Sequence, residues 1–298
     1  MSNDLALDKR LLRRSFEKAA AGYDAAAVLQ HEVCRRMLSR LDYIKHRPAA
    51  ILDAGSGTGN VVAALRARYP QARLYALDIA LAMVRRARGR MPWWQRLLGR
   101  GALPVCGDIE QLPLRDAAVG MVWSNLALQW MNDSQRAFAE CRRVLAPGGL
   151  LMFSTFGPDT LKELRAAYQG IDRYTHINRF IDMHDIGDML VHGGFADPVM
   201  DMEYITLTYS DVLALMRDLK AIGAHNVTTG RRPGMTARAT LEAVTRKYET
   251  LRRDGRLPAT FEVVYGHAWV PESPRLPAGL KPVKLHRPLR KGAGSVEF

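Results

Sequence analysis

The stretch ILDAGSGTGN, residues 51–60, limits the possible folds more than any other part of the chain. A short apolar run ends in Asp53 and is followed by Gly55, Gly57 and Gly59. Glycine is needed where a backbone turns sharply or comes close to a ligand. The segment therefore predicts a buried strand, a tight turn that can face a ligand, and a helix that begins near residue 59.

The spacing of these glycines excludes two common phosphate-binding loops. The nucleotide loop G-x-x-x-x-G-K-S/T needs a lysine, and none follows here. The dinucleotide loop G-x-G-x-x-G needs a glycine where this chain has Asn60. An acid ahead of the loop favours a cationic ligand group over a pyrophosphate. The pattern indicates S-adenosyl-L-methionine, which carries an ammonium and a sulfonium; a plain strand-to-helix turn is the simpler alternative.

Apolar strands alternate with helical stretches through the first half of the chain. Strands are predicted over residues 49–55, 73–79, 103–109, 118–125 and 150–156, and helices over 28–41, 59–68, 81–90 and 134–145. Such alternation with short links predicts a parallel sheet covered by helices on both faces. Ligands of such sheets bind at the carboxyl ends of the strands.

Polar side chains collect where four of these strands end, at Asp53, Asp78, Asp108 and Asn125. A carboxylate at Asp78 can accept hydrogen bonds from both ribose hydroxyls, as the acid of a dinucleotide-binding unit does. Its alternative role is to cap the next helix. Asp108 can accept from an adenine amino group, with Ile109 packed on the ring. Three strand ends thus supply what one adenosyl ligand needs.

The second half of the chain is less regular. A helix is predicted over 159–169, a non-helical segment over 174–180, a strand over 203–209, a helix over 210–223 capped by Ser210, and a last strand over 261–270. Residues 271–298 hold five prolines, six Lys or Arg and only two acids, so we expect a disordered basic tail. The segment 90–104, with Trp93 and Trp94 among arginines, is either a self-packed surface loop or a contact patch.

Composition narrows the partners and the compartment. The net charge of +13 predicts attraction to something acidic, and the basic residues do not interleave with aromatic ones as in RNA-binding motifs. An acidic protein partner is therefore favoured over nucleic acid. No apolar run approaches the roughly 20 residues of a membrane span, and the N-terminal acids do not suit a transit peptide, so cytoplasm is expected. Three distant cysteines predict neither a disulfide framework nor a zinc site.

Five segments carry a resemblance to one family: SFEKAAAGYD (15–24), GDIEQLPL (107–114), SNLALQW (124–130), HINRF (176–180) and MRDLKAIGA (216–224). They resemble the malonyl-acyl-carrier-protein O-methyltransferases of biotin synthesis, within the class I S-adenosylmethionine-dependent methyltransferases. The resemblance covers about residues 15–270, and the segment 90–104 and the tail depart from it.

The resemblance implies an α/β fold, a Rossmann-like seven-stranded sheet with helices on both faces and a mixed C-terminal substrate cap. It divides residues 1–270 into an N-terminal helical lid (1–45), a cofactor-binding core (46–156) and substrate-side elements (157–270), with the tail at 271–298.

The implied reaction transfers a methyl group from S-adenosyl-L-methionine to the free carboxylate of a malonyl thioester on acyl carrier protein. The ester hides the charge, so that fatty-acid synthesis can elongate the chain. A carboxylate with a pKa near ~4 is already ionised at neutral pH, so no general base is required. Catalysis would come from alignment and desolvation. The carrier protein is strongly acidic, so it would be attracted to this basic chain. A monomer is favoured.

The resemblance and the strand ends together give a candidate site. The expected cofactor residues are Asp53, Gly55, Gly57, Gly59, Asp78, Ile79, Asp108, Ile109, Asn125 and Tyr23. The candidate holders of the substrate carboxylate are Arg179, Lys220 and Arg217, of which Arg179 is slightly favoured because its segment is not helical. Trp130 is either a wall of the transfer site or a core residue, and His176 is expected to be structural.

Three other functions stay open from the sequence. The segments 156–165 and 257–266 are also similar to the complex-I assembly factors linked to arginine hydroxylation. A small-molecule methyltransferase acting on a quinone-type ring usually needs a base near the methyl group, and none is evident. A binding module that keeps the cofactor pocket without turnover is the third alternative.

Overall fold

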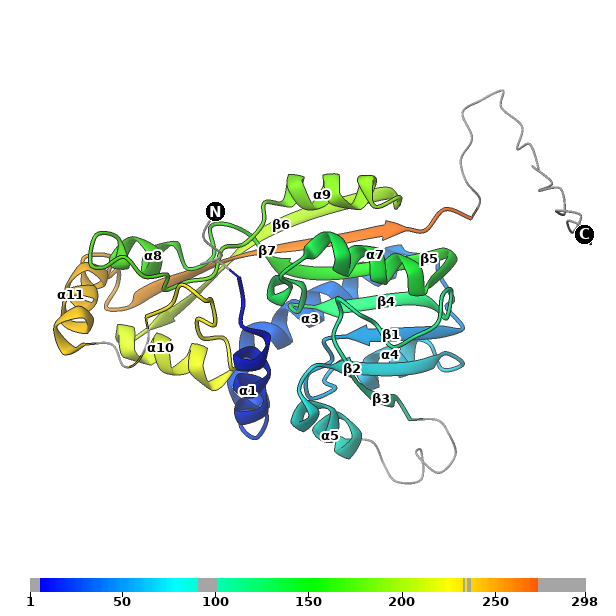
Figure 1. The fold of residues 1–298 in the computed structure, drawn as a ribbon, viewed down its shortest axis with the longest axis horizontal. Coiled ribbons are helices and arrows are strands. Elements are labelled where there is room, and N and C mark those ends of the chain that lie inside the picture. The colour runs from blue at the N-terminus through cyan, green and yellow to red at the C-terminus, as the bar shows by residue number, and fades with distance from the viewer. Residues whose placement is uncertain (1–5, 91–100, 233, 235–236, 273–298) are drawn as a thin grey trace, which may run out of the picture.

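The computed structural model describes residues 6–90, 101–232, 234 and 237–272. Seven strands form one mixed sheet in the order β3-β2-β1-β4-β5-β7-β6 (Figure 1). The first five strands run parallel, whereas β7 is antiparallel to β5 and to β6. The strands are β1 (Ala50–Ala54), β2 (Arg73–Asp78), β3 (Leu103–Cys106), β4 (Val119–Asn125), β5 (Leu145–Phe156), β6 (Ala196–Tyr209) and β7 (Leu257–Trp269). The predicted α/β class with a seven-stranded Rossmann-like sheet is confirmed.

The helices lie before the first strand and between the strands. They are α1 (Lys9–Ala19), α2 (Tyr23–Ala26), α3 (Val28–Arg40), α4 (Val62–Arg68), α5 (Leu81–Arg90), α7 (Ser134–Val144), α8 (Lys162–Tyr168), α9 (Met183–His192), α10 (Val212–Ala221) and α11 (Arg238–Glu249), with short 3-10 turns at Leu41–Tyr43 and Leu128–Trp130. The N-terminal part was expected to be helical, and α1, α2 and α3 lie within it.

Successive residues of the central strands pack into two different hydrophobic clusters. Ile51 of β1 belongs to the cluster that includes Val33 of α3 and Leu65 of α4. Its neighbour Leu52 belongs to the cluster that includes Phe138 of α7. Because side chains alternate between the faces of a strand, this division shows that helices cover the sheet on both sides.

The two last strands of the sheet are longer than the sequence predicts. Strand β6 has 14 residues and β7 has 13, and their paired ends project past β5, where α8, α10 and α11 gather around them (Figure 1). The predictions over 203–209 and 261–270 were right in place but too short. The missed parts contain Asp197, Pro198 and Pro258, residue types that are depleted from strands. The projecting ribbon builds a second lobe beside the parallel sheet.

Several predicted boundaries were wrong by a few residues. Helix α10 is capped by Asp211, not Ser210, because the Asp211 carboxylate accepts a hydrogen bond from the Ala214 N–H at 2.8 Å. Strand β3 ends at Cys106, so Asp108 lies in the turn after the strand. Helix α8 starts at Lys162, because Leu161 adopts a left-handed φ of 56° that no helix continues through.

Helices α9 and α11 were not predicted, and two predictions cannot be compared with the structure. Residues 91–100, most of the tryptophan-containing segment, and residues 273–298 of the expected tail lie outside the described part of the chain. The proposed division into lid, core and substrate-side parts stays a prediction.

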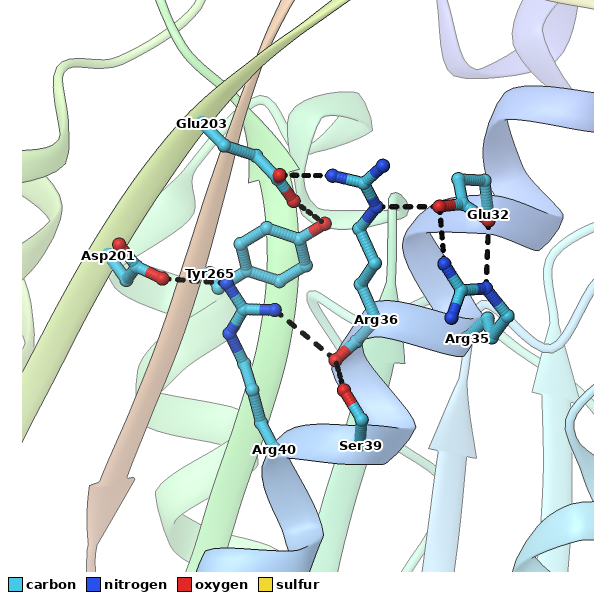
Figure 2. A network of polar contacts seen from close by, with 8 residues as sticks. All are labelled: Glu32, Arg35, Arg36, Ser39, Arg40, Asp201, Glu203 and Tyr265. Atoms are coloured by element: carbon cyan, nitrogen blue, oxygen red, sulfur yellow. Dashed lines mark hydrogen bonds and ion pairs between the residues drawn. The ribbon is translucent and has the colours of Figure 1, made fainter.

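A polar network ties α3 to the two antiparallel strands (Figure 2). Arg36 of α3 pairs with Glu203 of β6, and Arg40 pairs with Asp201 of β6 at 2.6 Å. Tyr265 of β7 donates its hydroxyl hydrogen to Glu203 at 2.7 Å and carries the Arg40 guanidinium 3.7 Å above its ring. The helix that follows the N-terminal segment is therefore held to the part of the sheet that carries the second lobe.

Candidate functional site

The glycine loop after β1 needs glycine for two separate reasons. Gly55 has a φ of 82°, and a Cβ there would lie 2.2 Å from the Ala127 Cβ, so no side chain fits. Gly57 also has a positive φ, of 53°, but a Cβ there would meet only the Tyr23 ring, at 3.9 Å. The backbone at Gly57 is thus left open toward the cavity that the loop faces.

Two carboxyl groups are buried beside this loop, Asp53 with 4% of its surface exposed and Asp78 with 9%. Asp78 accepts hydrogen bonds from the Gly57 N–H at 2.9 Å and the Ala80 N–H at 2.8 Å. One carboxyl oxygen of Asp53 is buried and has no hydrogen-bond partner within the described part of the chain. Burial and then the charge of Asp78 raise the pKa of Asp53 to about 8. Burial raises the pKa of Asp78 to about 6, although these N–H groups lower it.

An unsatisfied buried carboxyl oxygen costs free energy unless something occupies the site. A cationic group beside Asp53 would remove that cost, and the ammonium of S-adenosyl-L-methionine is such a group. The open backbone at Gly57 supplies the close approach that the adenosyl part needs. The residues present therefore fit this cofactor.

The loop opens onto a cavity, the cofactor cavity, at the carboxyl ends of β1, β2 and β4. Of the residues expected from the sequence, its lining includes Tyr23, Gly55, Gly57, Asp78, Ile79, Asp108, Ile109 and Asn125. Asp53 lines an adjoining hollow that also contains Gly55 and Gly57. Gly59 lies deeper, where a Cβ would come within 2.9 Å of the Ala87 Cβ of α5, so it serves packing between loop and helix. The structure thus brings together the acids and glycines that lie far apart in the sequence.

The N-terminal segment closes the cofactor cavity, and the sequence did not single out its contacts. Lys9 lines the cavity and pairs with Asp108 at 3.0 Å and with Glu110 at 2.8 Å. Glu17 accepts the Leu81 N–H at 2.8 Å, at the start of α5. These contacts join residues that are remote in the chain, so no local pattern could have found them.

A second cavity of about 540 Å³, the lobe cavity, lies between the sheet and the projecting lobe. Gln30, Trp130, Phe156, Ile222 and Ala224 line both cavities, so the two share a wall. Trp130 meets Phe16 of α1 edge to face, with ring centroids 5.5 Å apart. Trp130 is thus a wall of the site rather than a core residue.

The three predicted carboxylate holders fall in different places. Lys220 lines the lobe cavity. Arg217 is exposed on the same helix, α10. Arg179 is also exposed and lines a separate hollow of about 190 Å³ on the other side of Phe180. Lys220 is exposed as well, so the three cations differ in the hollow they line and not in burial. Which of them holds the carboxylate stays a prediction, including Arg179, the residue that the sequence slightly preferred.

The expected structural histidine is held by its neighbours. His176 lines the lobe cavity, bonds Asp172 at 2.7 Å and stacks on Tyr168 with ring centroids 3.7 Å apart. These two contacts are compatible with the structural role expected for it. His225, which was not among the residues predicted from the sequence, lines the same cavity.

Comparison with solved structures shows the fold. The YcgJ protein from Bacillus subtilis aligns with a TM-score of 0.56 and 14% identity, covering 80% of this chain and all of that chain. A Bacillus halodurans protein described as a methyltransferase aligns with a TM-score of 0.54 and 20% identity, covering 78% of this chain and 98% of that one. No helix among the described residues is long and apolar enough to cross a membrane.

Comparison with known sequences shows the family as well as the fold. A family model described as a methyltransferase domain matches residues 52–153, which hold the glycine loop and the acids of the cofactor cavity. A protein of Nitrosospira multiformis is 61% identical over 90% of this chain and 91% of its own length. A protein of Gallionella capsiferriformans is 58% identical over 92% and 94%. Both are named malonyl-(acyl-carrier protein) O-methyltransferase, and at this identity and coverage the chain belongs to that family of S-adenosylmethionine-dependent methyltransferases.

Proposed function

We propose that this protein transfers the methyl group of S-adenosyl-L-methionine to the free carboxylate of a malonyl thioester carried on acyl carrier protein. The observation that carries the proposal is the wall shared by the cofactor cavity and the lobe cavity. A methyl group can pass only between ligands that meet, and this wall is where two ligands would meet.

The cofactor residues act by binding and by excluding water. Asp53 and the open loop at Gly57 would hold the amino-acid end of S-adenosyl-L-methionine, and Asp78 would accept from the ribose hydroxyls. The sulfonium supplies an electrophilic methyl group. Trp130 and Phe156, both on the shared wall, would keep water from the path of transfer. A dry, aligned site strengthens every electrostatic interaction inside it.

The lobe cavity suits an acyl group that ends in a carboxylate. Its lining is largely apolar, with Leu29, Leu164 and Phe261 among its residues, and it contains the cation Lys220. The carboxylate arrives ionised, so the protein has to position it and need not remove a proton. The excess of basic residues gives an acidic carrier protein a surface to approach. A monomer in the cytoplasm stays a prediction from the sequence.

The test is a methyl-transfer assay with labelled S-adenosyl-L-methionine and either malonyl- or acetyl-acyl carrier protein. Label on the malonyl form alone supports the proposal, because the acetyl form lacks the accepting carboxylate. Label on both forms, or on neither while cofactor binding is intact, would overturn it. Parallel assays with a quinone-type ring substrate and an arginine peptide cover the alternative chemistries.

A further inference from the structure

The lobe cavity contains a histidine whose ring is satisfied on one side only. His225 follows α10 and lines the cavity together with Lys220. Its Nε2 lies 2.9 Å from the Ser15 hydroxyl of α1. Its Nδ1 is buried and has no hydrogen-bond partner among the residues that the structure describes. A buried polar atom left without a partner in a ligand cavity calls for a ligand that completes it.

The contacts of Ser15 show which ring nitrogen of His225 carries the hydrogen in the neutral form. The Ser15 hydroxyl donates its hydrogen to the Leu11 carbonyl at 2.8 Å. A hydroxyl has one hydrogen, so toward His225 it can only accept, and Nε2 must carry the N–H. In the neutral ring Nδ1 is then a bare acceptor, which would repel a carboxylate. In the protonated ring Nδ1 is a donor.

The residues around His225 keep its ring neutral when no ligand is bound. They also attract an anion into the cavity. Burial, and then the charges of Lys220, Arg231 and Lys18, lower the pKa of His225 below its ordinary value. These three cations come from α10, from the segment after it and from α1, and none of them takes part in an ion pair between described residues.

The acidic groups that line the same cavity, or border it, already have partners of their own. Asp218 accepts the Tyr209 hydroxyl at 2.7 Å, and Asp172 is held by His176 at 2.7 Å. Both carboxylates keep their charge, but the charges that act on the pKa of His225 are those of the three cations. A carboxylate from outside would relieve the repulsion and let the ring accept a proton.

We propose that His225 is a second binding residue for the substrate carboxylate beside Lys220, and that it takes up a proton when a malonyl thioester enters the cavity. This inference rests on the proposed function. One carboxylate oxygen would accept from the Nδ1–H and the other stays free to attack the methyl group. When the ester forms the negative charge disappears, so His225 returns the proton to solvent and the reaction consumes none.

The direct test counts protons during binding. Calorimetric titration of malonyl-acyl carrier protein into the protein loaded with S-adenosylhomocysteine, at pH 7 in buffers of different ionisation enthalpy, gives the net uptake. We expect an uptake approaching one proton for the malonyl carrier and none for the acetyl carrier, which presents the same surface without the carboxylate. Equal uptake for the two carriers, or no uptake for either, would overturn the proposal, and neither result depends on a variant.

A variant of His225 tests whether the proton taken up on binding goes to this ring. His225→Gln keeps a polar group near Ser15 but cannot be charged, so we expect a KM for malonyl carrier about tenfold to a hundredfold higher at pH 6.5, from loss of a charge-assisted hydrogen bond. The wild-type KM should rise with pH through the titration of the ring, and the KM of the variant should be flat. His184→Gln, on the exposed face of α9, is the matched control and should behave as the wild type.

Different results would contradict the role of His225 and the proposed function. If the wild type does not methylate malonyl carrier at all, the function is wrong. If it does, and His225→Gln keeps the wild-type KM and pH profile, the function stands and His225 does not hold the carboxylate. Unchanged affinity for S-adenosylhomocysteine in the variant shows that it folds and that the loss is confined to the acyl side.

Discussion

At the scale of single residues, Asp53 links the stability of the free protein to pH. Its pKa is about 8 in the folded chain and near the ordinary 3.8 in the unfolded one. Between these values the folded state holds a proton that the unfolded state has lost, so stability falls as pH rises toward 8. We expect the unfolding temperature without ligand to decrease from pH 6 to pH 8. Asp53→Asn, which is uncharged throughout, should flatten that decrease, and an unchanged slope would contradict the assignment.

Asp78 holds the loop and, by our proposal, the ribose. Its carboxylate accepts two backbone N–H groups, from Gly57 and Ala80, and hydrogen bonds to a charged group contribute about 1.5–3 kcal/mol each. Asp78→Ala should therefore weaken S-adenosyl-L-methionine binding by at least about a hundredfold in a calorimetric titration. Arg179→Ala is the control, since Arg179 is exposed and does not itself line the cofactor cavity. Equal losses in the two variants would mean that Asp78 acts through folding alone.

Three polar residues of the cofactor cavity and its adjoining hollow could be predicted from the sequence because they lie at or beside the end of a strand. Asp53, Asp78 and Asn125 end apolar runs, and parallel strands bring their carboxyl ends to one edge. Lys9 and His225 could not be found in this way. Their roles depend on where α1 and the segment after α10 pack in three dimensions, and a lysine or histidine in an irregular segment gives no periodic signal.

At the scale of elements, the network of Figure 2 should contribute measurably to stability. Tyr265→Phe removes the hydroxyl that donates to Glu203 and leaves the pair between Glu203 and Arg36 in place. We expect a loss of about 1 kcal/mol in the free energy of unfolding, measured in urea. Tyr204→Phe is the matched control, because that hydroxyl makes a 3.3 Å contact from a side chain that is 52% exposed. A loss as large in the control would show that the network adds nothing specific.

The same elements show why the sequence predicted the parallel sheet better than the lobe. Strands β1, β2 and β4 are buried on both faces and read as continuous apolar runs. Strand β6 lies at the edge of the sheet, and its residues alternate between half-buried and exposed, so only its apolar end stood out. Helix α9 lies against that strand, and its two buried residues are Ile186 and Leu190. Its apolar residues are interrupted by Asp185, Gly187 and Asp188, so no helix was predicted there.

At the scale of the whole molecule, the N-terminal segment contacts residues of both cavities. Lys9 reaches Asp108 and Glu110 on the cofactor side, and Ser15 of the same helix reaches His225 on the lobe side. Helix α1 is drawn between the sheet and the lobe in Figure 1. Helix α1 therefore lines the cofactor cavity directly and touches the lobe cavity only through His225. Lys9, Leu12 and Phe16 of this segment line the cofactor cavity, so we expect cofactor exchange to move it.

This arrangement predicts that the segment sets the rate of cofactor release. Lys9→Met removes two half-buried ion pairs, each worth up to about 1 kcal/mol, so S-adenosylhomocysteine should dissociate roughly fivefold to tenfold faster. Stopped-flow displacement measures that rate. Added salt should speed release from the wild type more than from Lys9→Met, because screening acts on pairs that the variant lacks. Arg238→Met removes an exposed pair with Glu242 on α11 and should leave the rate unchanged. An unaltered rate in Lys9→Met would mean that the segment opens without breaking these pairs.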